Sequence, residues 1–274
     1  MRTLSFELVP DPGSFTPLQL KPTVLLATCF NASERWSRAY GVPLQVAIRD
    51  LQIAFVVRVA RLRYLASFVH ANVDCLNVTA TRCSLRDGAQ LELRAFFEPR
   101  PKHRVAEVSL CLVPLSLSEG EGDMAGLPAP MPPAYLEQFL PSERFSQPYP
   151  SPFPGVVREI AESEDLLASH EQPLSIHRQH CGFVDQWYFV EAANFAATSR
   201  ERMVLQHGAR IPALRRGLSL PVREMDMLFL RPFYLFDQGK VRTRAFRGPG
   251  GLTFIHELIK DDPTEPHALV VERF

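Results

Sequence analysis

The sequence predicts an α+β fold made of two copies of one unit. Each half of the 274-residue chain contains one long helical pattern that ends at a glycine. Short segments with the period-two alternation of antiparallel strands follow each helical pattern. Segments of the first half also recur, in the same order, in the second half. One helix followed by an antiparallel meander predicts a sheet that wraps around a helix.

The repeat is detected from an offset that drifts slowly along the chain. Small insertions and deletions in the loops of two copies of one fold produce such a drift. We therefore predict two domains of the same fold. The matching segments are residues 4–6 with 174–176 at an offset of 170, 33–35 with 200–202 at 167, and 57–65 with 222–230 at 165.

Two long helices are predicted, at about Leu20–Tyr40 and about Val190–His207. Gly41 and Gly208 follow them directly, and a glycine at this position is the usual left-handed cap of a helix. The predicted strands of the first copy are Thr3–Val9, Ile53–Tyr64, Val73–Cys83, Ala89–Phe97 and Val105–Val113. Those of the second copy are Leu174–Gln179, Leu218–Leu230, Lys240–Arg247, Leu252–Lys260 and His267–Arg273.

A proline-rich segment separates the two copies. Nine prolines lie between Pro128 and Pro154, a density that neither a helix nor a central strand tolerates. We therefore expect a first domain at residues 1–117, a linker at 118–171 and a second domain at 172–274. The aromatic residues of the linker predict that it lies on the protein surface, since a free spacer is more often purely polar.

The composition excludes several classes of function. The 30 Lys and Arg residues balance 30 Asp and Glu residues, so no overall positive field favours nucleic acid as a partner. No stretch approaches the roughly 18 apolar residues of a membrane span, and no apolar leader is present, so we expect a cytoplasmic protein without membrane contact. Five cysteines without a CxxC pair predict free thiols, with neither a disulfide framework nor a metal site.

The second copy carries a resemblance to a known fold. Residues 182–258 contain an acid before the helix (Asp185), an aromatic residue and an Arg-Glu pair on it (Phe195, Arg200-Glu201), a closing glycine, and a strand that runs into Leu230-Arg231-Pro232. This pattern resembles the hot-dog fold, and it is similar to the 4-hydroxybenzoyl-CoA thioesterase and acyl-ACP thioesterase families.

The resemblance covers about 220 of the 274 residues, as a tandem or double hot dog with a degenerate first copy. It implies two long helices wrapped by one continuous antiparallel sheet. A single hot dog normally dimerises to complete its site. The resemblance therefore implies a monomer with pseudo-dimeric halves, or a homodimer.

The same resemblance points to the start of the second helix as the site. Families with this fold usually read D-x-x-G-H-x-N-N-x-x-Y there, because thioester hydrolysis needs a carboxylate beside helix N–H groups that polarise the carbonyl. Here Tyr188 stands in place of the glycine and Phe189 in place of the histidine. The outline of the pattern is kept, whereas its chemistry is changed.

Two carboxylates are the catalytic candidates, Asp185 and Glu191. Either could activate water, although an acid near a helix start is also favoured by the helix dipole alone. The aromatic run beside them is either core or a wall of the acyl site. The candidate substrate-binding residues are Trp187, Tyr188, Asn194, Phe195 and Arg231.

Several arginines on predicted strands have two interpretations. They could hold the phosphates of coenzyme A or the acidic face of a carrier protein, or they could be ordinary charges on an exposed strand face. They are Arg61, Arg63, Arg231, Arg242 and Arg244.

Three functions follow from these observations. The first is hydrolysis of an acyl thioester of coenzyme A or of acyl carrier protein, in fatty-acid or polyketide metabolism, without a metal or organic cofactor. The second is a dehydratase or acyltransferase of a biosynthetic pathway. The third is a non-catalytic acyl-binding or scaffold protein, which the altered helix-start segment favours.

Overall fold

A computed structural model describes residues 1–100, 102–117, 127–153, 155–182, 185–261 and 266–274. Its strands form one continuous sheet in the order β1-β3-β4-β5-β2-β8-β11-β10-β9-β7. All neighbouring strands on this path are antiparallel. The predicted α+β class and the continuous antiparallel sheet are confirmed.

The two copies have the same elements in the same order. In each, an edge strand precedes a long helix, and four strands follow. The first copy contains β1 (Thr3–Leu8), α1 (Pro22–Tyr40), α2 (Leu44–Leu51), β2 (Ile53–Tyr64), β3 (Leu76–Leu85), β4 (Gln90–Glu98) and β5 (Ala106–Ser116). The second contains β7 (Asp165–Ser175), α5 (Glu191–His207), α6 (Pro212–Gly217), β8 (Glu224–Phe229), β9 (Gln238–Gly248), β10 (Gly251–Lys260) and β11 (Ala268–Arg273).

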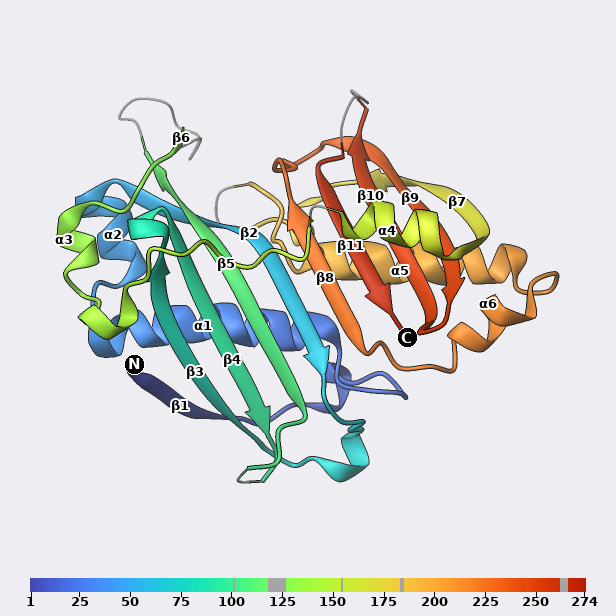
Figure 1. The fold of residues 1–274 in the computed structure, drawn as a ribbon, viewed down its shortest axis with the longest axis horizontal. Coiled ribbons are helices and arrows are strands. Elements are labelled where there is room, and N and C mark those ends of the chain that lie inside the picture. Colours follow the sequence, from blue (N-terminus) through green and yellow to red (C-terminus); the bar gives the residue numbers. More distant parts are fainter. Residues whose placement is uncertain (101, 118–126, 154, 183–184, 262–265) are drawn as a thin grey trace.

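The copies join where β2 pairs with β8. The paired residues run from Val59 opposite Leu228 to Arg63 opposite Glu224. Figure 1 shows α1 and α5 on one face of the sheet, whereas α4 (Val156–Ser163) and the segment that leads to it cross the other face. The main core lies between the sheet and the two long helices, whose inward residues include Leu25, Leu26 and Ala196.

The proline-rich segment packs closely on the outer face of the sheet. It also includes β6 (Leu127–Pro128) and α3 (Pro133–Leu136). Tyr149 packs with residues of the first copy, among them Cys83 and Cys111. Phe153 packs with residues of the second copy, among them Phe246 and Val271. The segment therefore covers apolar side chains that the sheet would otherwise expose on this face.

Two strands of the second copy differ from the sequence prediction. The first strand was predicted at Leu174–Gln179, but β7 covers Asp165–Ser175 and so begins within the segment assigned to the linker. The prediction missed the first residues of β7 because the strand contains Pro173. β7 tolerates this proline because it is an edge strand that pairs only with β9. The strand predicted at Leu218–Leu230 is shortened to β8, because the turn that follows α6 and an extended segment occupy residues 218–223.

The predicted left-handed glycine caps are wrong. Gly41 has φ −165° and Gly208 has φ −64°, so neither lies in the left-handed region. Close packing explains Gly208, where an added Cβ would lie 2.5 Å from the Val204 carbonyl oxygen. At Gly41 an added Cβ would lie 2.0 Å from Gln138 Oε1, so that side chain would have to move.

Within the described residues, no helix combines the length and apolarity that crossing a membrane requires.

Candidate functional site

Asp185 lies on the protein surface at the approach to α5. Its side chain is 55% exposed and forms an ion pair with Arg178. Its backbone has φ 51°, a left-handed conformation that aspartate tolerates better than most residues. The carboxylate is therefore accessible to solvent and already bound to a positive charge.

Glu191 is the first residue of α5 and is half-buried. Asn194 Nδ2 donates a hydrogen bond to Glu191 Oε2 at 2.8 Å. A carboxylate in the first turn of a helix is stabilised by the helix dipole. The structure thus brings together two of the predicted site residues, Glu191 and Asn194.

Aromatic rings from both copies fill the space at the start of α5. Trp187 is buried and stacks on Phe195, with 6.4 Å between ring centroids. Phe30 of α1 meets Tyr188 at 6.1 Å and Phe189 at 5.5 Å. Burial raises the pKa of Tyr188 to about 12, so its hydroxyl stays neutral at physiological pH. The rings act as core here, and a role in substrate binding stays a prediction.

Four of the strand arginines form ion pairs with carboxylates, and the pair of Arg61 involves the nearly buried Asp226. Arg231 lies in the exposed loop after β8, where its backbone N–H donates to the His267 carbonyl oxygen. The other four arginines face carboxylates on neighbouring strands, which favours the interpretation of a charged strand face. The pairs are Arg61 with Asp226, Arg63 with Glu107 and Glu224, Arg242 with Glu171 and Glu257, and Arg244 with Glu257.

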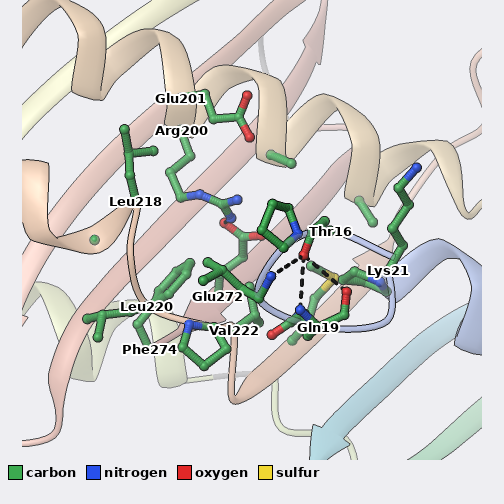
Figure 2. Close-up of a pocket in the computed structure, with 18 of the residues that line it drawn as sticks. Thr16, Gln19, Lys21, Arg200, Glu201, Leu218, Leu220, Val222, Glu272 and Phe274 are labelled. Atoms are coloured by element: carbon green, nitrogen blue, oxygen red, sulfur yellow. Dashed lines mark hydrogen bonds and ion pairs between the residues drawn. The ribbon is translucent and has the colours of Figure 1, made fainter. Parts of the chain in front are cut away.

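A cavity of about 560 Å³ lies at the start of the other long helix, α1. Its walls are the segment 16–23, one face of α5 and the loop 217–222, and Met225, Glu272 and Phe274 also line it (Figure 2). Among the described residues of the predicted site, Asn194 lines this cavity and the others do not.

Local sequence explains how the wall beside α1 forms. The Thr16 hydroxyl accepts hydrogen bonds from the Leu18 and Gln19 backbone N–H groups at 3.2 and 3.1 Å, which closes a tight turn. Pro22 then occupies the first helical position, where its missing N–H has no cost. On the facing side, α5 presents the small residues Ala193 and Ala197, which leave room for a ligand.

A chain of buried polar side chains runs from the cavity into the second copy. Arg200 Nη1 donates to Glu272 Oε2. The same carboxylate oxygen lies 3.2 Å from His256 Nε2, and His256 Nδ1 lies 2.8 Å from the Thr243 hydroxyl. The Ser199 hydroxyl ends the chain, 2.6 Å from that of Thr243.

Glu272 is ionised at all physiological pH values. Burial alone would raise the pKa of this carboxyl, but the positive charge of Arg200 and the hydrogen bond with His256 outweigh burial and lower the pKa to about 2. A carboxylate with so low a pKa is a weak base at neutral pH. Its role is therefore to hold Arg200.

Metal ligands do not gather in the part of the chain that the structure describes: no group of three or more His, Cys, Asp or Glu side chains could hold an ion there.

Comparison with solved structures places this arrangement among known folds. Over 99% of this chain and 94% of the other, the structure of an oleoyl thioesterase from Lactobacillus plantarum superposes with a TM-score of 0.73 at 11% identity. The chain has the double hot-dog fold. The 12:0-ACP thioesterase from Umbellularia californica gives a TM-score of 0.67 at 7% identity over 99% and 96% of the two chains.

An acyl-ACP thioesterase from Bacteroides thetaiotaomicron gives 0.65 at 9% identity over 99% and 97%. No protein-family model matches the sequence, and a search of curated proteins gives no match. The predicted resemblance to the hot-dog thioesterases is thus confirmed at the level of the fold.

A double hot dog has two equivalent helix starts, and in this chain the surroundings of the two starts differ. The start of α5, which carries the predicted site, is filled by rings. The start of α1, in the copy that was interpreted as degenerate, borders the cavity.

Sequence reasoning missed the buried polar chain, although a signal for it exists. Thr243, His256 and Glu272 each occupy an inward position of a strand between two apolar inward neighbours. A polar residue that interrupts such a pattern on several strands indicates a buried polar cluster.

Proposed function

We propose that the protein hydrolyses an acyl thioester bound in the cavity at the start of α1. The observation that carries this proposal is the cavity itself, at the junction of the two copies of a double hot dog. Its volume of about 560 Å³ falls in the ordinary range of about 300–1,000 Å³ for small-molecule sites. The structural neighbours described as acyl-ACP thioesterases support a thioester of coenzyme A or of a carrier protein as substrate.

The start of α1 supplies the groups that polarise a carbonyl. The first N–H groups of a helix have no partner within the helix, and they lie at its positive end. Among the cavity-lining residues there, Thr23 carries an N–H without a partner in the helix, whereas the Lys21 N–H donates to the Ser14 carbonyl oxygen and Pro22 has no N–H. A thioester carbonyl placed beside the Thr23 N–H would have one donor for the negative charge of its tetrahedral intermediate.

Glu191 is the proposed base for the attacking water. Its partner Asn194 lines the cavity and would hold the attacking water, and the Glu191 carboxylate would have to accept the proton from that water directly, because an amide side chain does not relay protons. Asp185 is the second candidate base, at the more exposed position. Glu272 is unsuited to this role, because its pKa of about 2 leaves little tendency to accept a proton.

The first test uses a panel of acyl-CoA and acyl-ACP thioesters with the full chain. Glu191→Gln should lower kcat by at least about 100-fold, the usual contribution of a general base. Asp185→Asn should retain activity if Glu191 is the base. The assignment of the base is wrong if Glu191→Gln retains full activity.

The second test asks whether the cavity is the site. Ala197→Leu places a larger side chain into the cavity, whereas Thr198→Leu changes the exposed neighbouring position of the same helix. Activity should fall in the first variant and persist in the second. Equal activity of both variants would place the reaction elsewhere, and a wild-type protein inactive on the whole panel would contradict hydrolysis.

A specific observation favours a second candidate function, acyl binding without turnover. Rings occupy the α5 start, and neither Asp185 nor Glu191 lines the cavity in the described structure. In that case an acyl thioester binds with a measurable Kd and no free acid is released. Equilibrium binding together with product analysis by mass spectrometry separates the two functions.

A further inference from the structure

Arg200 brings unused hydrogen-bond donors into the wall of the cavity, beside the apolar side chains of Met225 and Phe274. Its side chain is 12% exposed, and because the residue lines the cavity, this accessible part opens there. Nη1 donates to Glu272 Oε2, whereas Nε and Nη2 donate to no residue that the structure describes. A nearly buried donor without an acceptor is unfavourable. Water meets this need until a bound ligand displaces it.

The guanidinium group of Arg200 is held in place by two neighbours. Its carbon atom lies 5.0 Å from the centroid of the Phe274 ring. Its partner Glu272 is only 1% exposed, and Glu272 Oε2 also lies 3.2 Å from His256 Nε2. His256 is fixed in turn, because its Nδ1 lies 2.8 Å from the Thr243 hydroxyl. The free donors of Arg200 therefore keep one direction, which makes the site selective for where an acceptor lies.

The charges around the cavity favour a neutral acceptor over an anion. Lys21 and Arg200 line the cavity with positive charges, and Glu201 and Glu272 line it with negative ones, so these four charges cancel. Glu272 also compensates Arg200 directly. A carboxylate brought to Arg200 would lie close to Glu272, and this repulsion would offset its attraction to the guanidinium. A hydroxyl or ketone oxygen accepts the same hydrogen bonds without that repulsion.

Arg200 lies away from the proposed position of the reacting carbonyl. The proposed function holds the attacking water at Asn194, six residues before Arg200 on α5 and so about 9 Å from it along the helix axis. Figure 2 shows Lys21, at the start of α1, on a different side of the cavity from Arg200. The small residue Ala197 lies between Asn194 and Arg200 in sequence and also lines the cavity. An acyl chain that runs from the carbonyl along α5 therefore passes Ala197 and comes to Arg200.

We infer that the cavity selects acyl groups that carry a neutral oxygen on the chain, such as a hydroxyl or a ketone, and that Arg200 recognises this oxygen. An unsubstituted alkyl chain would displace water from Nε and Nη2 of Arg200 and leave these donors without an acceptor. A chain with its own oxygen replaces the displaced water. This inference rests on the proposed function for the acyl nature of the ligand and for the position of its carbonyl.

The test measures binding of amides, which replace the thioester and make the result independent of turnover. The probes are N-methyloctanamide, its derivatives with a hydroxyl on the third, fifth or seventh carbon, and the N-methyl monoamide of octanedioic acid, which ends in a carboxylate. In calorimetry on the full chain, at least one hydroxy probe should bind at least about ten-fold more tightly than N-methyloctanamide, the usual effect of a hydrogen bond to a charged group. Equal affinity of N-methyloctanamide and every hydroxy probe would overturn the inference, and so would a carboxylate probe that binds most tightly.

A conservative variant assigns the preference to Arg200. Arg200→Lys keeps a positive charge beside Glu272 but removes the planar fork, so it should weaken the hydroxy probe and leave the affinity for N-methyloctanamide unchanged. Arg202→Lys is the matched control, since Arg202 is exposed on the same helix and does not line the cavity. An unchanged preference in Arg200→Lys, or an equal loss of affinity for both probes, would overturn the role of Arg200. Should this variant fail to fold, the comparison of probes on the wild type still decides the inference.

The proposed hydrolysis and this inference fail independently. Thioesters of the same acyl groups should show the preference of the amides in kcat/KM. A preference for a hydroxy amide without turnover of any thioester supports this inference and contradicts hydrolysis. Turnover with equal kcat/KM for the unsubstituted and all hydroxy thioesters supports hydrolysis and overturns this inference.

Discussion

Arg61 lies directly opposite Asp226 where the two copies join, and its Nε donates to Asp226 Oδ1 at 3.1 Å. Asp226 is only 4% exposed and also accepts a hydrogen bond from Arg273 Nη1 at 2.8 Å. The joint between β2 and β8 therefore combines main-chain pairing with a carboxylate shared by two arginines. A nearly buried carboxylate in this position is costly to disturb.

Asp226→Asn should lower the free energy of unfolding by about 2 kcal/mol, because two charge-assisted hydrogen bonds are weakened. Urea unfolding followed by circular dichroism measures this change. Asp50→Asn is the control, since Asp50 pairs with Arg49 on the surface at 46% exposure. Its effect should be much smaller, because an exposed ion pair contributes little to stability. Equal losses in the two variants would show that the joint depends little on Asp226.

Gly239 provides a test of the packing between β9 and β10. A Cβ at this position would lie 2.2 Å from the Ile259 carbonyl oxygen, which is main chain and cannot rotate away. Gly239→Ala should therefore destabilise the protein by at least about 2 kcal/mol. Gly250→Ala is the matched control, because no atom lies within 4 Å of its added Cβ. Thermal unfolding of the two variants should differ clearly, and similar melting temperatures would contradict the described register.

Phe153 tests whether the proline-rich segment stabilises the sheet that it covers. The ring is 5% exposed and packs on the outer face with Phe246 and Val271. Phe153→Ala should cost about 3 kcal/mol, as for other buried phenylalanines. Phe145 of the same segment is 37% exposed, and its replacement by alanine should cost about 0.5 kcal/mol. A negligible loss for Phe153→Ala would mean that the segment lies only loosely on the sheet.

Acid should weaken the fold through Glu272. Its pKa is about 2 in the folded protein against an ordinary value of 4.5, so ionised Glu272 stabilises the fold above about pH 4.5. This contribution, at most about 3 kcal/mol, is lost as the pH falls toward 2. The difference in unfolding free energy between the wild type and Glu272→Gln should therefore shrink from pH 6 to pH 3. The exposed Glu162→Gln variant should show a constant small difference, and the same behaviour in Glu272→Gln would contradict the pKa.

The fold could be predicted from sequence because its signals are local and repeated. The predicted strand Ile53–Tyr64 has the bounds of β2, and the predicted helix Val190–His207 differs from α5 by one residue. Alternation in a strand and helical periodicity both indicate that one face of the element is buried. In this fold the sheet and the two long helices bury such faces against each other. Prediction failed at β7 because this strand contains Pro173. An edge strand has a neighbour on one side only, so it tolerates a proline that a central strand would exclude.

The site was less predictable because its residues come from distant segments. Lys21 of the first copy lines the same cavity as Arg200 and Glu272 of the second copy only because the two copies join. No local motif records that meeting, and the motif that resembles known families lies at the other helix start. Side-chain direction also decides accessibility: Asp185 turns to Arg178 at the surface, whereas Asn194 reaches the cavity.

The filled start of α5 and the open start of α1 have an evolutionary consequence. In a symmetric homodimer one gene encodes both pockets, so a substitution that closes one closes the other. Fusion of the copies into a single chain removes this constraint. Phe30, Tyr188 and Phe189 can turn one pocket into hydrophobic core while the other stays open. Two copies within one chain can therefore diverge separately, and here the start of α1 borders a cavity whereas the start of α5 is packed with rings.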